Sequence, residues 1–389
     1  MRVRRTAWVS IRVAVVPVLV LGLAAGGYSA VAAPREVAGG LRVDAKTSAI
    51  NLIALLTGVA ATSPRRAWAV GWTDEFSQPS HPVILRWNGA AWQQVRGLSP
   101  ADASLQGVAA VSAGDAWAVG FSHGALIMHW TGAKWRRARS PNAGTGSRLL
   151  GVAAPSDRSA WAVGCVSCVA GGGEPLVLAW NGKSWRRAKL PRTGSQSELT
   201  GVAASSARNA WAVGCTKCGT TGSKALILHW NGAAWRRVRL PGTGSASELS
   251  GVAVLSARAA WAVGCSKCGF GSSQSLILRW TGRTWQRERV PATGAANQMS
   301  GVAVRSARSA WAVGSGGHTR LGVPKTLIFR WNGAAWKRVS SPNTAGDNGG
   351  AVVSVVATSG SNAWAVGNNF NDEAQTLILH WNGRAWTRS

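Results

Sequence analysis

Hydrophobic and polar positions alternate along this chain in short segments, and the same four segments return about every 50 residues. In the copy at residues 201–240, the small apolar run GVAAS is followed by AWAVG, by LILHW and by the charged segment AWRRVRL. Alternation with a period of two and short branched runs are typical of strands, and the repeats show no helical period. An Asn-Gly or Thr-Gly pair between the third and fourth segments predicts a hairpin turn in every copy. Each repeat therefore predicts four antiparallel strands.

Three tryptophans recur at fixed places in each repeat. One lies in AWAVG or its variant, one ends the third segment, and one opens the fourth segment five positions later. The seven sets are Trp68, Trp87, Trp92; Trp117, Trp130, Trp135; Trp161, Trp180, Trp185; Trp211, Trp230, Trp235; Trp261, Trp280, Trp285; Trp311, Trp331, Trp336; and Trp364, Trp381, Trp386. Of the 23 tryptophans, only Trp8 and Trp72 fall outside these sets.

Seven repeats of four strands predict an all-β fold, a seven-bladed β-propeller of four-stranded antiparallel blades that forms one domain over residues 55–389. An open β-solenoid is the alternative, but its coils are usually shorter and its strands parallel. In a propeller the inner strands carry Gly and Ala because the blades crowd toward the axis, and Trp fills the wider outer gaps. We therefore expect the repeated Trp residues to pack between blades, with a stacking platform for sugar rings as the alternative.

The order of these residues resembles kelch-type repeats. In kelch units a second strand ends in Gly, a third ends in an aromatic residue before a turn, and a Trp opens the fourth, and WAVGCTKC followed by LILHWNGAAW has this order. The usual double Gly is reduced to one in most units, and the aromatic spacing is shorter. The chain is also similar to secreted repeat proteins of actinobacteria, most of which have no assigned activity. The resemblance covers Leu55 to Ser389 and implies the propeller fold rather than a function.

The first residues have the pattern of an export signal. A basic start is followed by an apolar run at Val13–Leu23 and by the small-residue site Ala30-Val31-Ala32. The pattern predicts a signal peptide at residues 1–32 and a secreted or cell-wall-associated protein, with no membrane span after cleavage. An uncleaved anchor and a twin-arginine signal are the alternatives. Residues 33–54 form a linker, in which Leu41–Lys46 is a candidate clasp strand because the last repeat stops three residues after Trp386.

The net charge of +29 favours anionic partners. Much of it lies on the fourth segment of the repeats, which is the outermost strand of a blade. The candidate residues for an anionic partner are Arg136, Arg137, Arg186, Arg187, Arg236, Arg237, Arg287 and Arg338. A second set, Arg158, Arg208, Arg258 and Arg308, lies in the first turn. The alternative is that charges on an outer strand only discourage pairing between sheet edges. Export and the lack of a nucleic-acid-binding signature argue against nucleic acid.

Loop lengths separate the two faces of the predicted disc. Turns after the first and third strands lie on one face and have fixed length, whereas the connection from the second to the third strand, on the other face, varies. Because variable loops on a rigid scaffold carry specificity, ligand candidates are sought there. They are Trp72, Asp74, His81, His123 and His318. We expect His129, His229 and His380, which precede the third-strand Trp, to be blade-surface residues rather than ligands.

Four carboxylates converge where the seventh and first repeats meet on ring closure. Asp74, Glu75, Asp372 and Glu373 could hold Ca²⁺ or supply an acid/base pair for glycosidic chemistry. Solvated loop polarity is the alternative, because none of these residues lies in a ligand-spaced motif. Apart from Ca²⁺, the sequence predicts no cofactor.

All six cysteines lie in variable loops as CxxC pairs: Cys165 and Cys168, Cys215 and Cys218, Cys265 and Cys268. In an exported protein such a pair favours a disulfide within the loop. A closed zinc site needs four ligands, and pairs on neighbouring blades are expected to lie on the order of 10 Å or more apart. Thioredoxin-like chemistry expects the pair at a helix start. We therefore expect disulfides and no metal.

The single tyrosine, Tyr28, lies in the signal. The mature chain therefore lacks the tyrosine nucleophile of sialidase-like propellers and the tyrosine ligands of galactose-oxidase-like propellers. The third to fifth units are nearly identical, whereas an active site requires blades to diverge. The sequence favours an exported, monomeric, non-enzymatic binding or scaffold protein for an anionic surface polymer, a polysaccharide or a protein. A glycoside hydrolase or polysaccharide lyase that uses Asp74, Glu75, Asp372 and Glu373 is the alternative.

Overall fold

The structure is a computed structural model, and it describes residues 54–73, 80–98, 100, 102–141, 143–144, 146–169, 172–194, 196–269, 273–294, 296–318, 323–342, 349–370 and 374–389. The predicted signal peptide, the clasp strand Leu41–Lys46 and the loop carboxylates Asp74, Glu75, Asp372 and Glu373 lie outside these residues. The described residues contain strands and turns and no helix. Among them there is accordingly no helix that could cross a membrane.

The chain forms seven sheets of four strands, and each sheet uses four consecutive strands paired antiparallel in chain order. The strands of the first three blades are β1 Ala54–Ser63, β2 Arg66–Thr73, β3 Pro82–Trp87, β4 Trp92–Gln94; β5 Ser104–Ala110, β6 Ala116–Phe121, β7 Ala125–Trp130, β8 Trp135–Arg137; β9 Arg148–Ser156, β10 Ser159–Val169, β11 Gly172–Trp180, β12 Trp185–Arg187. Those of the fourth and fifth are β13 Glu198–Ser206, β14 Asn209–Thr216, β15 Lys224–Trp230, β16 Trp235–Arg237; β17 Glu248–Ser256, β18 Ala259–Ser266, β19 Gln274–Trp280, β20 Trp285–Arg287. Those of the last two are β21 Gln298–Ser306, β22 Ser309–His318, β23 Pro324–Trp331, β24 Trp336–Val339; β25 Gly349–Ser359, β26 Asn362–Phe370, β27 Ala374–Trp381, β28 Trp386–Arg388.

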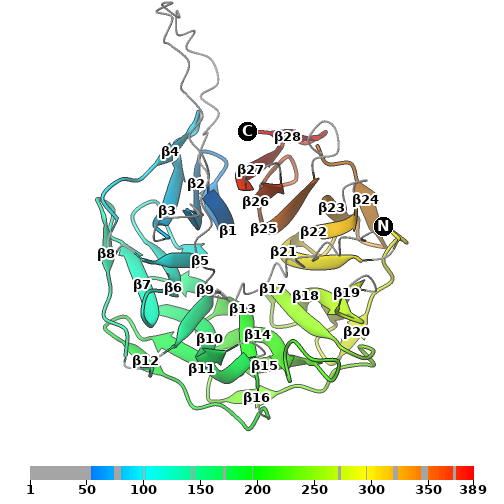
Figure 1. Cartoon of the computed structure of the whole chain (residues 1–389), viewed down its shortest axis with the longest axis horizontal. Helices are drawn as coiled ribbons and strands as arrows, with labels where there is room; N and C mark the ends of the chain where they lie inside the picture. Colours follow the sequence, from blue (N-terminus) through cyan, green and yellow to red (C-terminus); the bar gives the residue numbers. More distant parts are fainter. Residues whose placement is uncertain are drawn as a thin grey trace, which may run out of the picture.

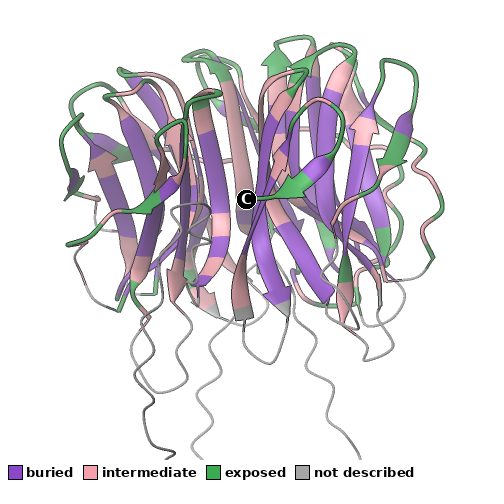
Figure 2. Cartoon of the chain, turned by 90° about the horizontal axis from the view of Figure 1, so that it is seen from above, coloured by how far each residue is buried: buried purple, intermediate pink, exposed green. Residues whose placement is uncertain are grey.

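The sheets stand around a central axis as the blades of a propeller (Figure 1). The predicted fold is therefore confirmed. The first strand of each blade lines the axis and the short fourth strand lies at the rim, as Figure 1 shows for β13 and β16. Seen from the side, the blades form a disc whose exposed turns gather along one edge (Figure 2).

Glycines let the inner strands approach one another. A side chain on Gly201 of β13 would place its Cβ 3.3 Å from the Cα atom of Gly251 in the next blade, and the same approach recurs between Gly151 and Gly201. This spacing is tighter than ordinary van der Waals contact, so the innermost position is best filled by a residue without a Cβ atom. Ser354 of β25 occupies this position in the seventh blade.

Tryptophan clusters fill the outer gaps between blades. Trp211 of β14 is fully buried and lies against Trp280 and Trp285 of the next blade, with ring centroids 4.9 and 5.1 Å apart. The first ring is tilted and the second is perpendicular, arrangements that aromatic pairs prefer. All seven blade junctions repeat this geometry, including the junction of Trp364 with Trp87 and Trp92. The repeated tryptophans thus pack between blades, as predicted.

The ring closes by direct contact between the seventh and first blades, which lie side by side in Figure 1. The backbone N–H of Leu56 donates to Oδ1 of Asn368 (3.0 Å), and that of Val59 donates to Oγ of Ser354 (3.3 Å). The hydroxyl of Thr376 donates to the carbonyl oxygen of Ala54 (3.0 Å). Among the described strands, none is exchanged between the first and last blades.

Candidate functional site

The two faces of the disc carry different connections, as the strand order predicted. The turns between first and second strands and between third and fourth strands share one side, which we call the fixed-length face. It comprises residues 64–65, 111–115, 157–158, 207–208, 257–258, 307–308 and 360–361, together with the hairpins 88–91, 131–134, 181–184, 231–234, 281–284, 332–335 and 382–385. The opposite side, which we call the variable face, carries the remaining connections.

The fourth strands place a basic rim around much of the disc. In β16, Trp235 is buried between blades, whereas Arg236 and Arg237 are exposed. The same pattern recurs through the second to sixth blades, where the exposed residues include Arg136, Arg137, Arg186, Arg187, Arg287 and Arg338. Among the described ion pairs, only Arg187 of this set has a carboxylate partner, Glu174 at 3.9 Å. The charge of the rim therefore faces solvent. The first blade interrupts it with Gln93 and Gln94.

The structure places the described ligand candidates on the first, second and sixth blades. Trp72 is half-buried near the end of β2 and pairs with Leu55 and Pro82 in the sheet. His81 is exposed beside it, and its backbone N–H donates to Oγ1 of Thr73 (3.0 Å). His123 lies in the second blade and His318 at the end of β22 in the sixth, where its side chain is not described. The three histidines are therefore not brought together.

A hollow of about 570 Å³ beside the second blade is lined by one of the histidine candidates and by residues of the basic rim. His123 and Gly124 line one side, and Arg137 and Arg139 line another. It lies where the connection between β6 and β7 is reduced to three residues, Ser122 to Gly124. In this tight turn His123 has a positive φ of 51°. His123, a ligand candidate, and Arg137, a candidate for the anionic partner, thus line the same hollow.

The register of the blades shows a relation that sequence reasoning missed. Trp72 follows the Gly of the second strand, so it occupies the same position as Cys165, Cys215 and Cys265. In the seventh blade this position holds Asn368, whose side chain closes the ring. Aligning the repeats on AWAVG would have revealed this position, which holds Cys in the third to fifth blades and a different residue in each of the others.

The three CxxC pairs are joined as disulfides, which supports the predicted pairing. Their Cα atoms lie 5.4 to 5.6 Å apart, within the usual range. The second cysteine of each pair also donates its backbone N–H to the segment before the first strand of its own blade, as Cys218 does to the carbonyl oxygen of Gln196 (3.1 Å). In the fourth blade the loop is further held by Glu248 of β17, which accepts from the N–H of Gly219 (2.9 Å).

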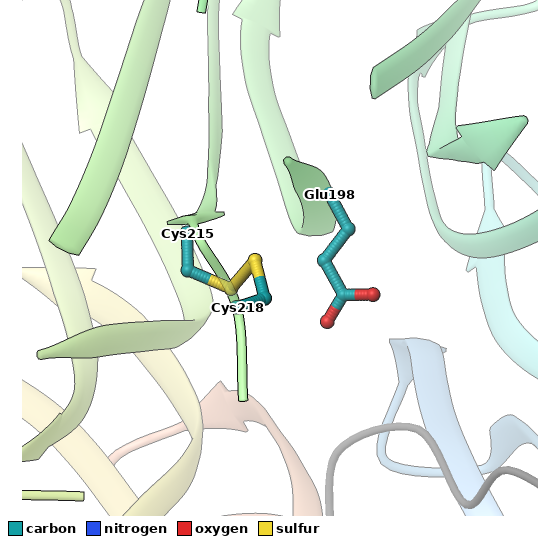
Figure 3. Close-up of side chains that lie close together, drawn as sticks. All are labelled: Glu198, Cys215 and Cys218. Carbon is teal, nitrogen blue, oxygen red and sulfur yellow. A yellow bond between two sulfur atoms is a disulfide. The ribbon is translucent and has the colours of Figure 1, made fainter. Parts of the chain in front are cut away.

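Glu198 lies beside one disulfide. Its carboxylate and the sulfur atoms of Cys215 and Cys218 all fall within 4.8 Å of one another (Figure 3). Because the two sulfur atoms are bonded to each other, they are not thiolates, and thiolates are the form in which cysteine ligates zinc. With the disulfide formed, this arrangement offers a metal one carboxylate.

His129, His229 and His380 stack on the second-strand Trp of their own blades, with ring centroids 3.8 to 4.3 Å apart. They behave as the predicted blade-surface residues, because each covers the edge of a tryptophan cluster. Nε2 of His229 lies 2.8 Å from Oδ1 of Asn209, and Nε2 of His129 lies 2.8 Å from Oδ1 of Asp115. Burial lowers the pKa of His229 and of His380 from the ordinary value of 6.5.

Comparison with known proteins supports the fold and leaves the function open. No protein-family model matches the sequence, and no curated protein is similar to it. A solved structure of YCF48 bound to a D1 peptide is 14% identical, covers 85% of this chain and 93% of that chain, and superposes with a TM-score of 0.54. The WD40 repeats of RRP9 are 14% identical, with 76% and 82% of the two chains covered and a TM-score of 0.51.

A GH74 xyloglucanase from Xanthomonas campestris is also similar in structure. It is 14% identical and has a TM-score of 0.55, and the match covers 87% of this chain and 53% of the enzyme. At this identity each likeness is one of fold. The comparisons therefore support the β-propeller fold of this chain.

Proposed function

We propose that this chain is an exported, non-enzymatic β-propeller that binds an anionic surface polymer. The observation that carries the proposal is the basic rim, whose exposed arginines recur in neighbouring blades and, apart from Arg187, have no carboxylate partner among the described ion pairs. Unpaired surface charge of one sign attracts an oppositely charged polymer over distances beyond direct contact. Export rests on the signal pattern of residues 1–32.

A purely structural role for the rim arginines is the competing explanation, since charges on a sheet edge discourage aggregation. The first blade keeps its fourth strand with Gln93, and the fifth keeps its own with Gln286 at the same position. Both fourth strands therefore form with an uncharged residue at this position, although the fifth blade keeps Arg287 next to it. The binding proposal therefore accounts for a charge that blade formation leaves unexplained.

The rim is tested by measuring how fast the mature chain, residues 33–389, associates with long-chain inorganic polyphosphate. A rim variant replaces Arg136, Arg186, Arg236 and Lys337 with Gln, the residue that the first and fifth blades carry there. Charges that steer an encounter act mainly on the association rate, so we expect slower association, with the largest difference from the unmodified chain at low salt. A wild-type chain that fails to bind at low salt, or a rim variant that associates as fast as wild type, would overturn the proposal.

A further inference from the structure

Each first turn of the fixed-length face is held by hydrogen bonds to its backbone, which we together call the frame. In the fourth blade the N–H of Arg208 donates to Oγ of Ser206 (3.2 Å), and the indole N–H of Trp230 donates to the carbonyl oxygen of Ala207 (3.0 Å). Gly232 of the neighbouring hairpin, at φ 95°, packs beneath the arginine, because a Cβ atom there would lie 3.2 Å from Cβ of Arg208. The backbone and the first side-chain atoms of Arg208 are therefore fixed before any partner arrives.

The arginine recurs in five of the seven frames. Besides Arg208, the residues are Arg65, Arg158, Arg258 and Arg308, each packed against the glycine of its own hairpin. The indole bonds of the frame recur from Trp87, Trp180, Trp280 and Trp331 to the carbonyl oxygens of Pro64, Asp157, Ala257 and Ala307. The arginine side chains are exposed, and none appears in the ion pairs described.

The second and seventh blades provide an internal control. There the arginine is replaced by Gly114 and Ser361, yet their backbone N–H groups still donate to the serine two residues earlier, at 3.2 Å in both blades. The indole bond persists as well, from Trp130 to Ala113 and from Trp381 to Gly360. The frame thus forms without the arginine side chain, so packing does not explain why five blades carry it.

The two blades that lack this arginine carry a basic residue elsewhere on the same face. Lys134 lies in the hairpin of the second blade and Arg384 in that of the seventh, and both are exposed. Every blade therefore presents positive charge on the fixed-length face. The acids in its turns are Asp115, which lies 2.8 Å from His129, and Asp157. These charges are therefore distributed over all seven blades on one face of the disc.

We infer that the fixed-length face is the docking surface for a linear polyanion that carries phosphate groups. Guanidinium groups bind phosphate through paired hydrogen bonds, and arginine is the basic residue in every frame that has one. A ring of sites, one or more to each blade, matches a polymer with repeating anionic groups, because successive contacts raise affinity through effective concentration. This inference rests on the proposed function and assigns docking to a face, while the rim attracts the polymer.

The test compares two variants that lose the same charge. The face variant replaces Arg158, Arg208, Arg258 and Arg308 with Ser, the residue that the seventh blade holds in this frame, and the rim variant described above is its control. Docking contacts act mainly on dissociation, so we expect the face variant to release polyphosphate at least about tenfold faster. The slope of log affinity against log salt should fall by about 3, the value for four lost phosphate contacts. Unchanged thermal unfolding would show that both variants are folded.

Three results would overturn the inference. One is a face variant that dissociates like the wild type, and another is a rim variant that dissociates as fast as the face variant. In both cases the proposed function survives if the rim variant associates slowly. The third is a face variant that keeps its affinity for polyphosphate but loses binding to vesicles of anionic phospholipid, which would assign the face to a membrane surface. Tripolyphosphate, too short to span several blades, should compete poorly with the long chain.

Discussion

At the scale of single residues, the position before the third-strand Trp holds His in some blades and Arg in others, and both side chains cover a tryptophan. His229 stacks on Trp211, whereas Arg279 places its guanidinium 5.8 Å from the ring centre of Trp261. Both cover the exposed edge of a tryptophan cluster, one by ring stacking and the other by a cation–π contact. They differ in charge, because histidine changes its protonation near neutrality and arginine does not.

This difference predicts that acid weakens the fold through His229 and His380. Burial holds the pKa of both histidines in the folded chain below the ordinary value of 6.5. At a pH between the folded-state pKa and 6.5, the unfolded chain therefore takes up protons that the folded chain does not. The contribution of the neutral histidines to the free energy of unfolding is complete above pH 6.5. It is lost as the pH falls from 6.5 toward their pKa values in the folded chain. Urea unfolding across this range should show a shallower pH dependence after replacing both histidines with Gln. Arg330→Gln, which uncovers Trp311, should shift stability equally at every pH; a double variant with the wild-type slope would contradict the prediction.

At the scale of elements, the strands and hairpins could be predicted because their signals are local. Period-two alternation and the Asn-Gly pairs mark each strand within a few residues. The partners in contacts between distant residues could not be predicted this way. The indole N–H of Trp230 bonds a carbonyl group 23 residues away in the same blade, and Trp211 packs against Trp280 of the next blade. These contacts depend on side-chain direction in three dimensions, so the frame that holds Arg208 became visible only in the structure.

The CxxC loops give a prediction for an element. Each disulfide links cysteines three positions apart, and so small a loop removes little chain entropy on closure, which limits its stabilisation to about 2 kcal/mol. We expect Cys215→Ser/Cys218→Ser to lower the free energy of unfolding by no more than this while the blade remains folded. The sixth blade supports this expectation, because it forms with Ser315 at the first cysteine position.

Thiol counting provides the matched measurement. Unfolded wild-type chain should give no alkylated cysteine before reductant and six after it. Reductant should also lower the unfolding temperature of the wild type, but not that of a variant in which all six cysteines are Ser. Six reactive thiols in the protein as purified would contradict the disulfides.

At the scale of the whole molecule, the ring is nearly regular from the third to the fifth blade and irregular where its ends meet. Six blades place Gly at the innermost position, while the seventh places Ser354 there and uses its hydroxyl to accept from Val59. Likewise, the position of the first cysteine holds Asn368, which accepts from Leu56. Polar side chains thus add hydrogen bonds at the junction between the two ends of the described chain. Tryptophan clusters at all seven junctions, together with the aliphatic side chains packed around them, hold the blades to one another.

The junction should therefore be sensitive to the loss of one side chain. Asn368→Ala leaves the buried N–H of Leu56 without its acceptor, and such a loss typically costs about 1–3 kcal/mol. Ser315→Ala, at the equivalent buried position of the sixth blade, is the control and should cost less. Because the loss is at the junction, hydrogen exchange in Asn368→Ala should accelerate first in β1, β25 and β26 and later in the middle blades. Equal destabilisation by both variants, or uniform acceleration around the ring, would show that closure depends on the tryptophan clusters alone.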